Sequence, residues 1–189
     1  MGTSLSQGSP GTTNWNAVAA TYRSEAVPVD RVVQEVWRAA QSEIETDWQA
    51  LLGAPIIATC LDIAVRSETP SQALTVASRE IARARESSLA TEVAKRAIVQ
   101  SFAGEDRPLR FVQALFAEAS NYLVSRDLPA YVGSAGRNRT IEDAIHFKDL
   151  VRQRVMDVVG TDVPPGDPTI QRWPEFVMTT ARRLAGREL

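Results

Sequence analysis

The chain of 189 residues is poor in the residues that metal sites and disulfides require. It contains one histidine, His146, and one cysteine, Cys60. A single histidine excludes a metal site built from several histidines, and a single cysteine forms no disulfide within the chain. Because Cys60 lies in an apolar run, we expect a small buried side chain rather than a nucleophile. We expect no metal and no other cofactor.

Long hydrophobic runs and a strong charge of either sign are also missing. The longest apolar run, near 55–65, is far shorter than the about 20 residues that cross a bilayer. The first residues have neither a basic start nor an apolar core, unlike a secretory signal. The net charge is −2, and neither half of the chain is basic. We therefore expect a cytoplasmic protein without a membrane partner.

The hydrophobic residues that are present recur with a helical period almost throughout. No segment alternates with a period of two over a useful length. The pattern predicts an all-α fold, a compact bundle of about six to eight helices in a single domain. Residues 1–13 are predicted to be a disordered tail, 14–160 the helical domain, and 161–189 a connector rich in proline and glycine with a terminal amphipathic helix.

Several helix ends can be placed from capping residues. Asp30, Thr69, Asp106 and Thr140 are each positioned to cap the start of a helix. Gly53 is positioned to end the long second helix. Around Ser87 and Ser88 the apolar pattern changes sides, which favours two helices over one long helix.

His146 lies on a predicted helix with acidic neighbours, Glu142, Asp143 and Asp149. The apolar stripe of that helix is predicted to run through Ile141, Ala144, Ile145, Val151, Val155 and Val158. His146 points away from this stripe, and no third or fourth ligand can be placed beside it. We expect an exposed histidine without a metal.

The loop before that helix is the one segment with an anion-binding composition. Arg137 and Arg139 flank Asn138, and Thr140 begins a helix whose free N–H groups attract negative charge. The glycine spacing fits neither known phosphate-binding motif. Arg137, Arg139 and Thr140 are candidate ligand-binding residues, and an ordinary solvated loop is the alternative.

The terminal helix is the other candidate surface. Trp173, Phe176, Val177 and Leu184 form its apolar face. This face is costly to leave in water, so it packs either on its own chain or on a partner.

No motif in the sequence indicates an enzymatic reaction, and we expect a non-enzymatic protein. Helical domains without a catalytic or cofactor motif are most simply assigned to protein–protein recognition, as an accessory subunit, an adaptor or a homo-oligomer. The alternative is binding of a nucleic acid or a phosphate ligand through the Arg137/Arg139 loop.

Overall fold

The computed structural model describes residues 12–86, 88–133, 137–160 and 172–186. Within these ranges the fold is all-α, as predicted, and no residue lies in a strand. The elements are α1 (Thr12–Arg23), α2 (Val29–Gly53), α3 (Pro55–Arg66), α4 (Pro70–Ala84), α5 (Leu89–Ser101), α6 (Arg107–Asp127), the 3-10 helix η1 (Leu128–Tyr131), α7 (Ile141–Gly160) and α8 (Trp173–Leu184).

Most of the predicted helix ends are confirmed by hydrogen bonds. The Thr69 side chain accepts from the Gln72 N–H, and Asp106 accepts from the Leu109 N–H. Ser88 and Thr91 form a reciprocal capping box at the start of α5, so the chain does break between α4 and α5. Helix α2 ends at Gly53, as expected.

The predicted cap at Asp30 is wrong. Helix α2 begins at Val29, and the carbonyl of Pro28 already accepts from the Arg31 and Val32 N–H groups. Asp30 therefore lies inside the first turn, and its carboxylate forms an ion pair with Arg154 of α7. Proline at position 28 favours this earlier start because its extended conformation suits the residue before a helix.

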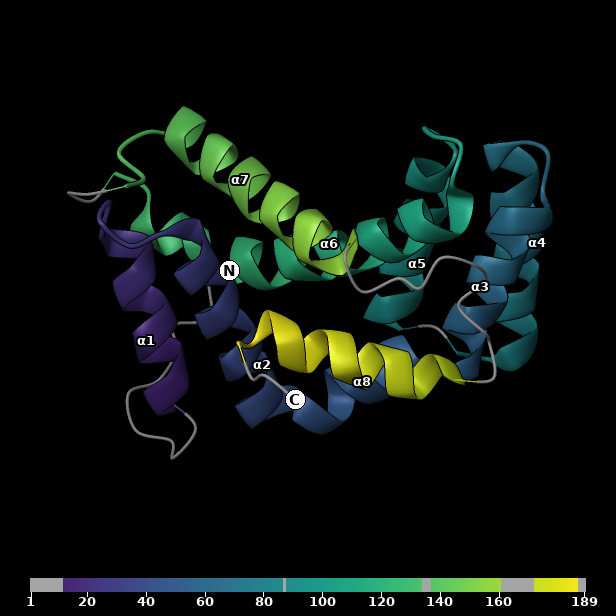
Figure 1. Ribbon diagram of the computed structural model, residues 1–189, viewed down its shortest axis with the longest axis horizontal. Helices are drawn as coiled ribbons and strands as arrows, with labels where there is room; N and C mark the ends of the chain where they lie inside the picture. Colours follow the sequence, from purple (N-terminus) through teal and green to yellow (C-terminus); the bar gives the residue numbers. More distant parts are fainter. Residues whose placement is uncertain (1–11, 87, 134–136, 161–171, 187–189) are drawn as a thin grey trace.

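Helix α6 is the centre of the bundle. It contacts α2, α3, α5, α7 and η1. Helices α3, α4 and α5 lie at one end of the molecule and α1 at the other, while α7 crosses above α6 (Figure 1). The apolar side chains of α6 fill the space among these helices, and Phe111, Leu115, Phe116 and Leu123 are fully buried.

Helix α8 packs along α2, so its apolar face is covered by its own chain. Trp173, Val177 and Leu184 are buried, and Phe176 is partly buried and stacked on Trp173. The Trp173 indole N–H donates to the Leu52 carbonyl over 2.7 Å. Of the two alternatives for this face, the structure has the intramolecular one. The predicted connector, 161–168, and residues 1–11 of the predicted tail lie outside the described residues. The last two residues of the predicted tail, Thr12 and Thr13, belong to α1.

Cys60 provides a chemical test of this core. Its side chain is 0% exposed, and burial raises the pKa of its thiol to about 12, while the charge of Lys95 opposes that shift. Only the thiolate reacts with maleimides or disulfide reagents, so labelling of the native protein at pH 8 should be slower than labelling of the urea-unfolded protein by at least about a hundredfold. Equal rates in the two states would contradict the packing of α3.

Candidate functional site

The predicted ligand-binding loop is built into the fold by its arginines. The Arg137 guanidinium donates to the backbone carbonyl of Val27 and, over 3.5 Å, to that of Glu25. It also lies 4.9 Å from the centroid of the Phe147 ring. Burial lowers the pKa of Arg137, and the carboxylate of Glu25 opposes that shift. Arg137 therefore ties the loop to the segment between α1 and α2.

The other two loop candidates have local partners as well. Arg139 forms an ion pair of 2.9 Å with Glu25. The Thr140 N–H donates to the Asp143 carboxylate, and the Asp143 N–H donates to the Thr140 hydroxyl. The Asp143 carboxylate thus already occupies the start of α7, where the sequence offered a candidate anion-binding site.

Asn138, which sequence reasoning did not single out, completes this attachment. Its side chain is buried and donates to the Tyr22 carbonyl over 3.2 Å, and its own backbone carbonyl accepts from the Gly133 N–H. Asparagine is common in loops, so its type alone gave no signal of burial. Asn138, like Arg137, positions the start of α7.

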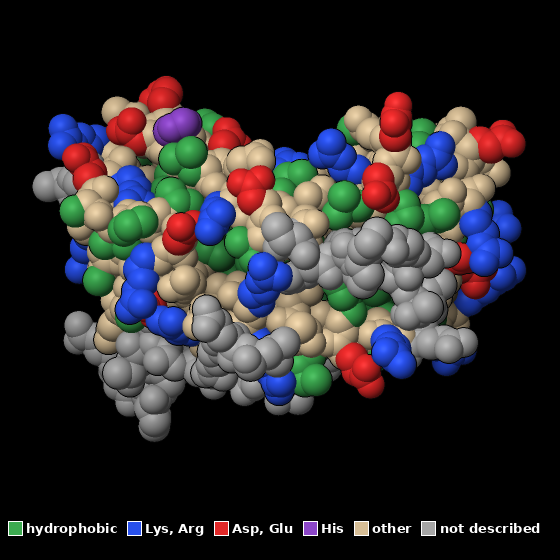
Figure 2. Space-filling model, viewed as in Figure 1, with side chains coloured by type: hydrophobic (Ala, Val, Ile, Leu, Met, Phe, Trp, Pro, Cys, Tyr) green, Lys and Arg blue, Asp and Glu red, His purple; other side chains and the backbone are tan. Residues whose placement is uncertain are grey.

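The predicted apolar stripe of α7 is partly wrong. Ala144, Phe147, Val151, Val155 and Val159 are buried, but Ile141 is 67% exposed and Ile145 is 53% exposed. The two isoleucines lie at the edge of the buried stripe of α7. They are the two most exposed large hydrophobic side chains among the residues whose burial the structure describes. Figure 2 shows hydrophobic side chains gathered on this part of the surface, over α7 and the segment before it.

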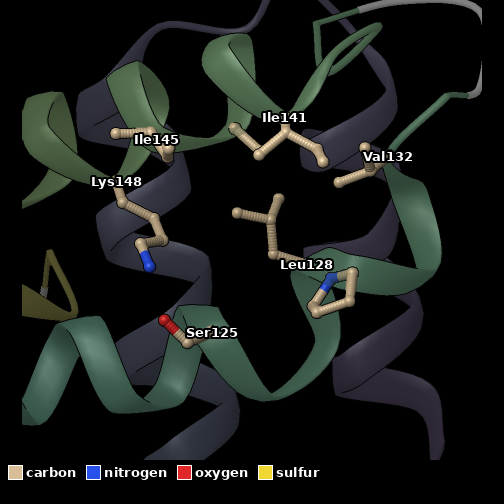
Figure 3. Close-up of a pocket in the computed structure, with 8 residues that line it drawn as sticks. Ser125, Leu128, Val132, Ile141, Ile145 and Lys148 are labelled. Atoms are coloured by element: carbon tan, nitrogen blue, oxygen red, sulfur yellow. The ribbon is translucent and has the colours of Figure 1, made fainter.

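A cavity of about 320 Å³ opens beside these isoleucines. The end of α6, η1, the turn after it and the first two turns of α7 form its walls (Figure 3). It is lined by Ser125, Leu128, Pro129, Val132, Ile141, Ala144, Ile145 and Lys148. Six of these eight side chains are purely apolar, which is typical of a ligand pocket rather than a solvated surface dimple. We call this cavity and the exposed surfaces of Ile141 and Ile145 the α7 groove.

Lys148 is the one charged residue among the described residues that line the cavity. Figure 3 shows its amine directed toward Ser125. Among the residues that the structure describes, Lys148 takes part in no hydrogen bond and no ion pair. The Ser125 hydroxyl donates to the Asn121 side-chain oxygen over 3.3 Å, so its proton is used within α6. The described lining therefore combines six apolar side chains with the Ser125 hydroxyl and the Lys148 amine.

The remaining polar features do not form a recognisable reaction centre. His146 is exposed, as predicted. Within the described ranges, no group of three or more His, Cys, Asp or Glu residues could hold a metal ion. A second cavity, between the start of α6 and the end of α7, has an acidic wall that includes Glu105, Asp106 and Asp157, with Arg110 beside them.

The comparisons with known proteins add no assignment. No family model, no curated protein and no solved structure matches the chain. No helix in the described part of the chain is long and apolar enough to cross a membrane. The geometry of the α7 groove is therefore the best available guide to function.

Proposed function

We propose that this protein recognises another polypeptide and that the α7 groove is its docking surface. The observation that carries the proposal is the pair of exposed isoleucines, Ile141 and Ile145, beside an apolar cavity. Large apolar side chains that lie together on a surface are typical of interaction sites. The expected assignment to protein–protein recognition is kept, but its surface moves from α8 to α7.

The size of the cavity favours a partner side chain over a large cofactor. A volume of about 320 Å³ is at the lower end of the range of about 300–1,000 Å³ for small-molecule sites. A small molecule inside it would leave the outer surfaces of Ile141 and Ile145 in water. A helix or an extended segment that inserts one apolar side chain would cover both isoleucines as well. Burying the exposed surfaces of both isoleucines contributes roughly 2–3 kcal/mol to the free energy of binding.

The alternative function, binding of a nucleic acid or a phosphate through Arg137 and Arg139, has weaker support. The Arg137 guanidinium is engaged with backbone carbonyls and an aromatic ring, and Arg139 pairs with Glu25. The arginines of α4 are interspersed with carboxylates, as in the Arg83–Glu80 pair. A phosphate backbone binds best to a cluster of unpaired cations.

The test is a selection of short random-sequence peptides displayed on phage against the immobilised protein, followed by affinity measurements with the substitution Ile145→Asp. We expect peptides with an apolar anchor, and we expect Ile145→Asp to weaken their binding by about thirtyfold or more, because it removes buried apolar area and places a charge in the interface. Circular dichroism should show unchanged helix content in the variant.

Val99→Asp is the matched control. Val99 is 46% exposed on α5 and is not part of the cavity wall, so the same change there should leave binding within about twofold. If the selection yields no binders, or only binders for which Ile145→Asp and Val99→Asp have equal effects, the groove is not the docking surface.

A further inference from the structure

We infer that the α1–α2 junction, residues 22–27, sets the shape of the α7 groove, and that Arg137 and Asn138 are the positioning residues through which it does so. The inference rests on the proposed function and adds how its docking surface is regulated. It requires that two walls of the groove meet through these residues, that the junction holds them, and that they do not contact the docked segment.

The two walls of the groove meet at a hydrogen bond. Val132 belongs to the wall formed by η1 and the turn after it, and Ile141 belongs to the wall formed by α7. Figure 3 shows these two side chains at the same end of the cavity. In the chain between them, the Gly133 N–H donates to the Asn138 carbonyl over 2.9 Å. The separation of the walls at this end therefore depends on where Asn138 is held.

The α1–α2 junction holds both positioning residues. The Asn138 amide donates to the Tyr22 carbonyl over 3.2 Å. The Arg137 guanidinium donates to the Val27 carbonyl. Because both acceptors are main-chain carbonyls, their positions follow the course of the backbone. The Phe147 ring adds a second link, since the Tyr22 ring lies edge-on to it at 5.8 Å and the Arg137 guanidinium lies 4.9 Å from it. A displacement of the junction is therefore felt at the start of α7.

The positioning residues act on docking indirectly. Neither Arg137 nor Asn138 is among the described residues that line the cavity. Asn138 is 1% exposed, so a docked segment does not reach it. Without these attachments, the walls are free to separate, and the docking-competent shape of the groove is populated for a smaller fraction of the time. The apparent affinity falls in proportion to that fraction.

The test measures the binding kinetics of peptides whose docking in the groove has been established by their sensitivity to Ile145→Asp. We expect Arg137→Ala and Asn138→Ala each to weaken binding about fivefold or more, because each removes an attachment of the loop. The loss should appear in the association rate constant. The dissociation rate constant should stay within about twofold of the wild type, because the contacts of the bound peptide are unchanged.

Arg107→Ala is the matched control. Like Arg137, Arg107 donates to a backbone carbonyl between two helices, that of Ser67, and lies over a phenyl ring, at 4.4 Å from the centroid of Phe102. It makes these contacts beside the end of α3, at the opposite end of the molecule from α1 (Figure 1). Arg107→Ala should therefore leave peptide binding within about twofold of the wild type.

Gly133→Ala tests the same hydrogen bond without removing a side chain. Gly133 has a φ of +82°, and an added β-carbon would meet no atom within 4 Å, so the substitution acts only through backbone strain. We expect it to slow peptide association about threefold. Gly133→Asn should stay within about twofold of the wild type, because asparagine tolerates the left-handed region better than alanine does.

Methyl NMR of the free protein tests the link to the groove without any peptide. In Arg137→Ala, the methyl signals of Ile141 and Ile145 should shift, whereas the signal of Ile98, which is buried in α5, should keep its position. In Arg107→Ala, the signals of Ile141 and Ile145 should not move.

The failures of the two proposals are distinguishable. If Arg137→Ala changes neither the Ile141 and Ile145 signals nor the association rate, or if Arg107→Ala weakens binding equally, the inference about the α1–α2 junction is overturned and the docking function stands. If the signals shift as expected but no peptide is sensitive to Ile145→Asp, the docking function is overturned, and the regulation of docking with it.

Discussion

Replacement of Trp173 by alanine should lower the free energy of unfolding by about 3–5 kcal/mol, which is a large share of the about 5–15 kcal/mol that stabilises a domain. Trp173 is 1% exposed, and its indole N–H donates to the Leu52 carbonyl at the end of α2. The substitution empties a large volume between α8 and α2 and leaves that carbonyl without its donor. Urea unfolding followed by circular dichroism measures the loss.

Glu175→Ala is the matched control for Trp173→Ala, because Glu175 is an exposed residue of the same helix. It should change the free energy of unfolding by no more than about 0.5 kcal/mol. A loss below about 1 kcal/mol for Trp173→Ala would mean that α8 is a detachable element, and its apolar face would again be a candidate docking surface.

Replacement of Arg96 and Arg152, the two arginines beside Glu118, by alanine should lower the free energy of unfolding by about 3 kcal/mol or more. Glu118 of α6 is buried, and it accepts from the Gln100 amide over 2.7 Å. Arg96 of α5 and Arg152 of α7 approach its carboxylate to 3.6 and 3.8 Å. In the double variant Arg96→Ala/Arg152→Ala, a buried carboxylate remains with one neutral donor. The opposite deletion, Glu118→Ala, should lower the free energy of unfolding by less than the double variant does, because the two arginines are partly exposed and water can solvate their charges.

The rescue experiment for this network adds Glu118→Leu to the double variant. Since the cost of the double variant comes from a buried charge without ionic partners, removing that charge should recover most of the lost stability. Thermal or urea unfolding of the four proteins measures the effect. If the triple variant is less stable than the double variant, the destabilisation comes from lost packing rather than from the unpaired carboxylate.

Local chemistry was enough to predict most helix ends. Thr69, Asp106 and Thr140 cap helices because their side-chain oxygens satisfy free N–H groups within the same turn, an interaction that depends on only a few neighbouring residues. Asp30 was predicted wrongly because Pro28 begins the helix earlier and because Arg154, distant in sequence, pairs with the carboxylate. Neither the long-range ion pair nor the competition between two start sites can be read from one segment.

The α7 groove could not be predicted from the sequence. The helical period gives the direction of each side chain around the axis of α7, but it does not say whether another element packs against that side. Ile141 and Ile145 lie close in angle to the buried stripe of α7, yet no described helix covers them. Their exposure depends on where α6 ends and η1 turns away. For Arg137 the sequence was misleading in the opposite way. The basic loop suggested a ligand site, but the Arg137 guanidinium donates to backbone carbonyls of the segment between α1 and α2.

The most direct test of the docking proposal is a methyl NMR titration of isoleucine-labelled protein with a peptide from the selection. The account predicts that the methyl signals of Ile141 and Ile145 shift as the peptide is added, whereas those of Ile57 and Ile98, which are fully buried, keep their positions. A bound peptide that shifts other isoleucine signals and leaves those of Ile141 and Ile145 unchanged would contradict it.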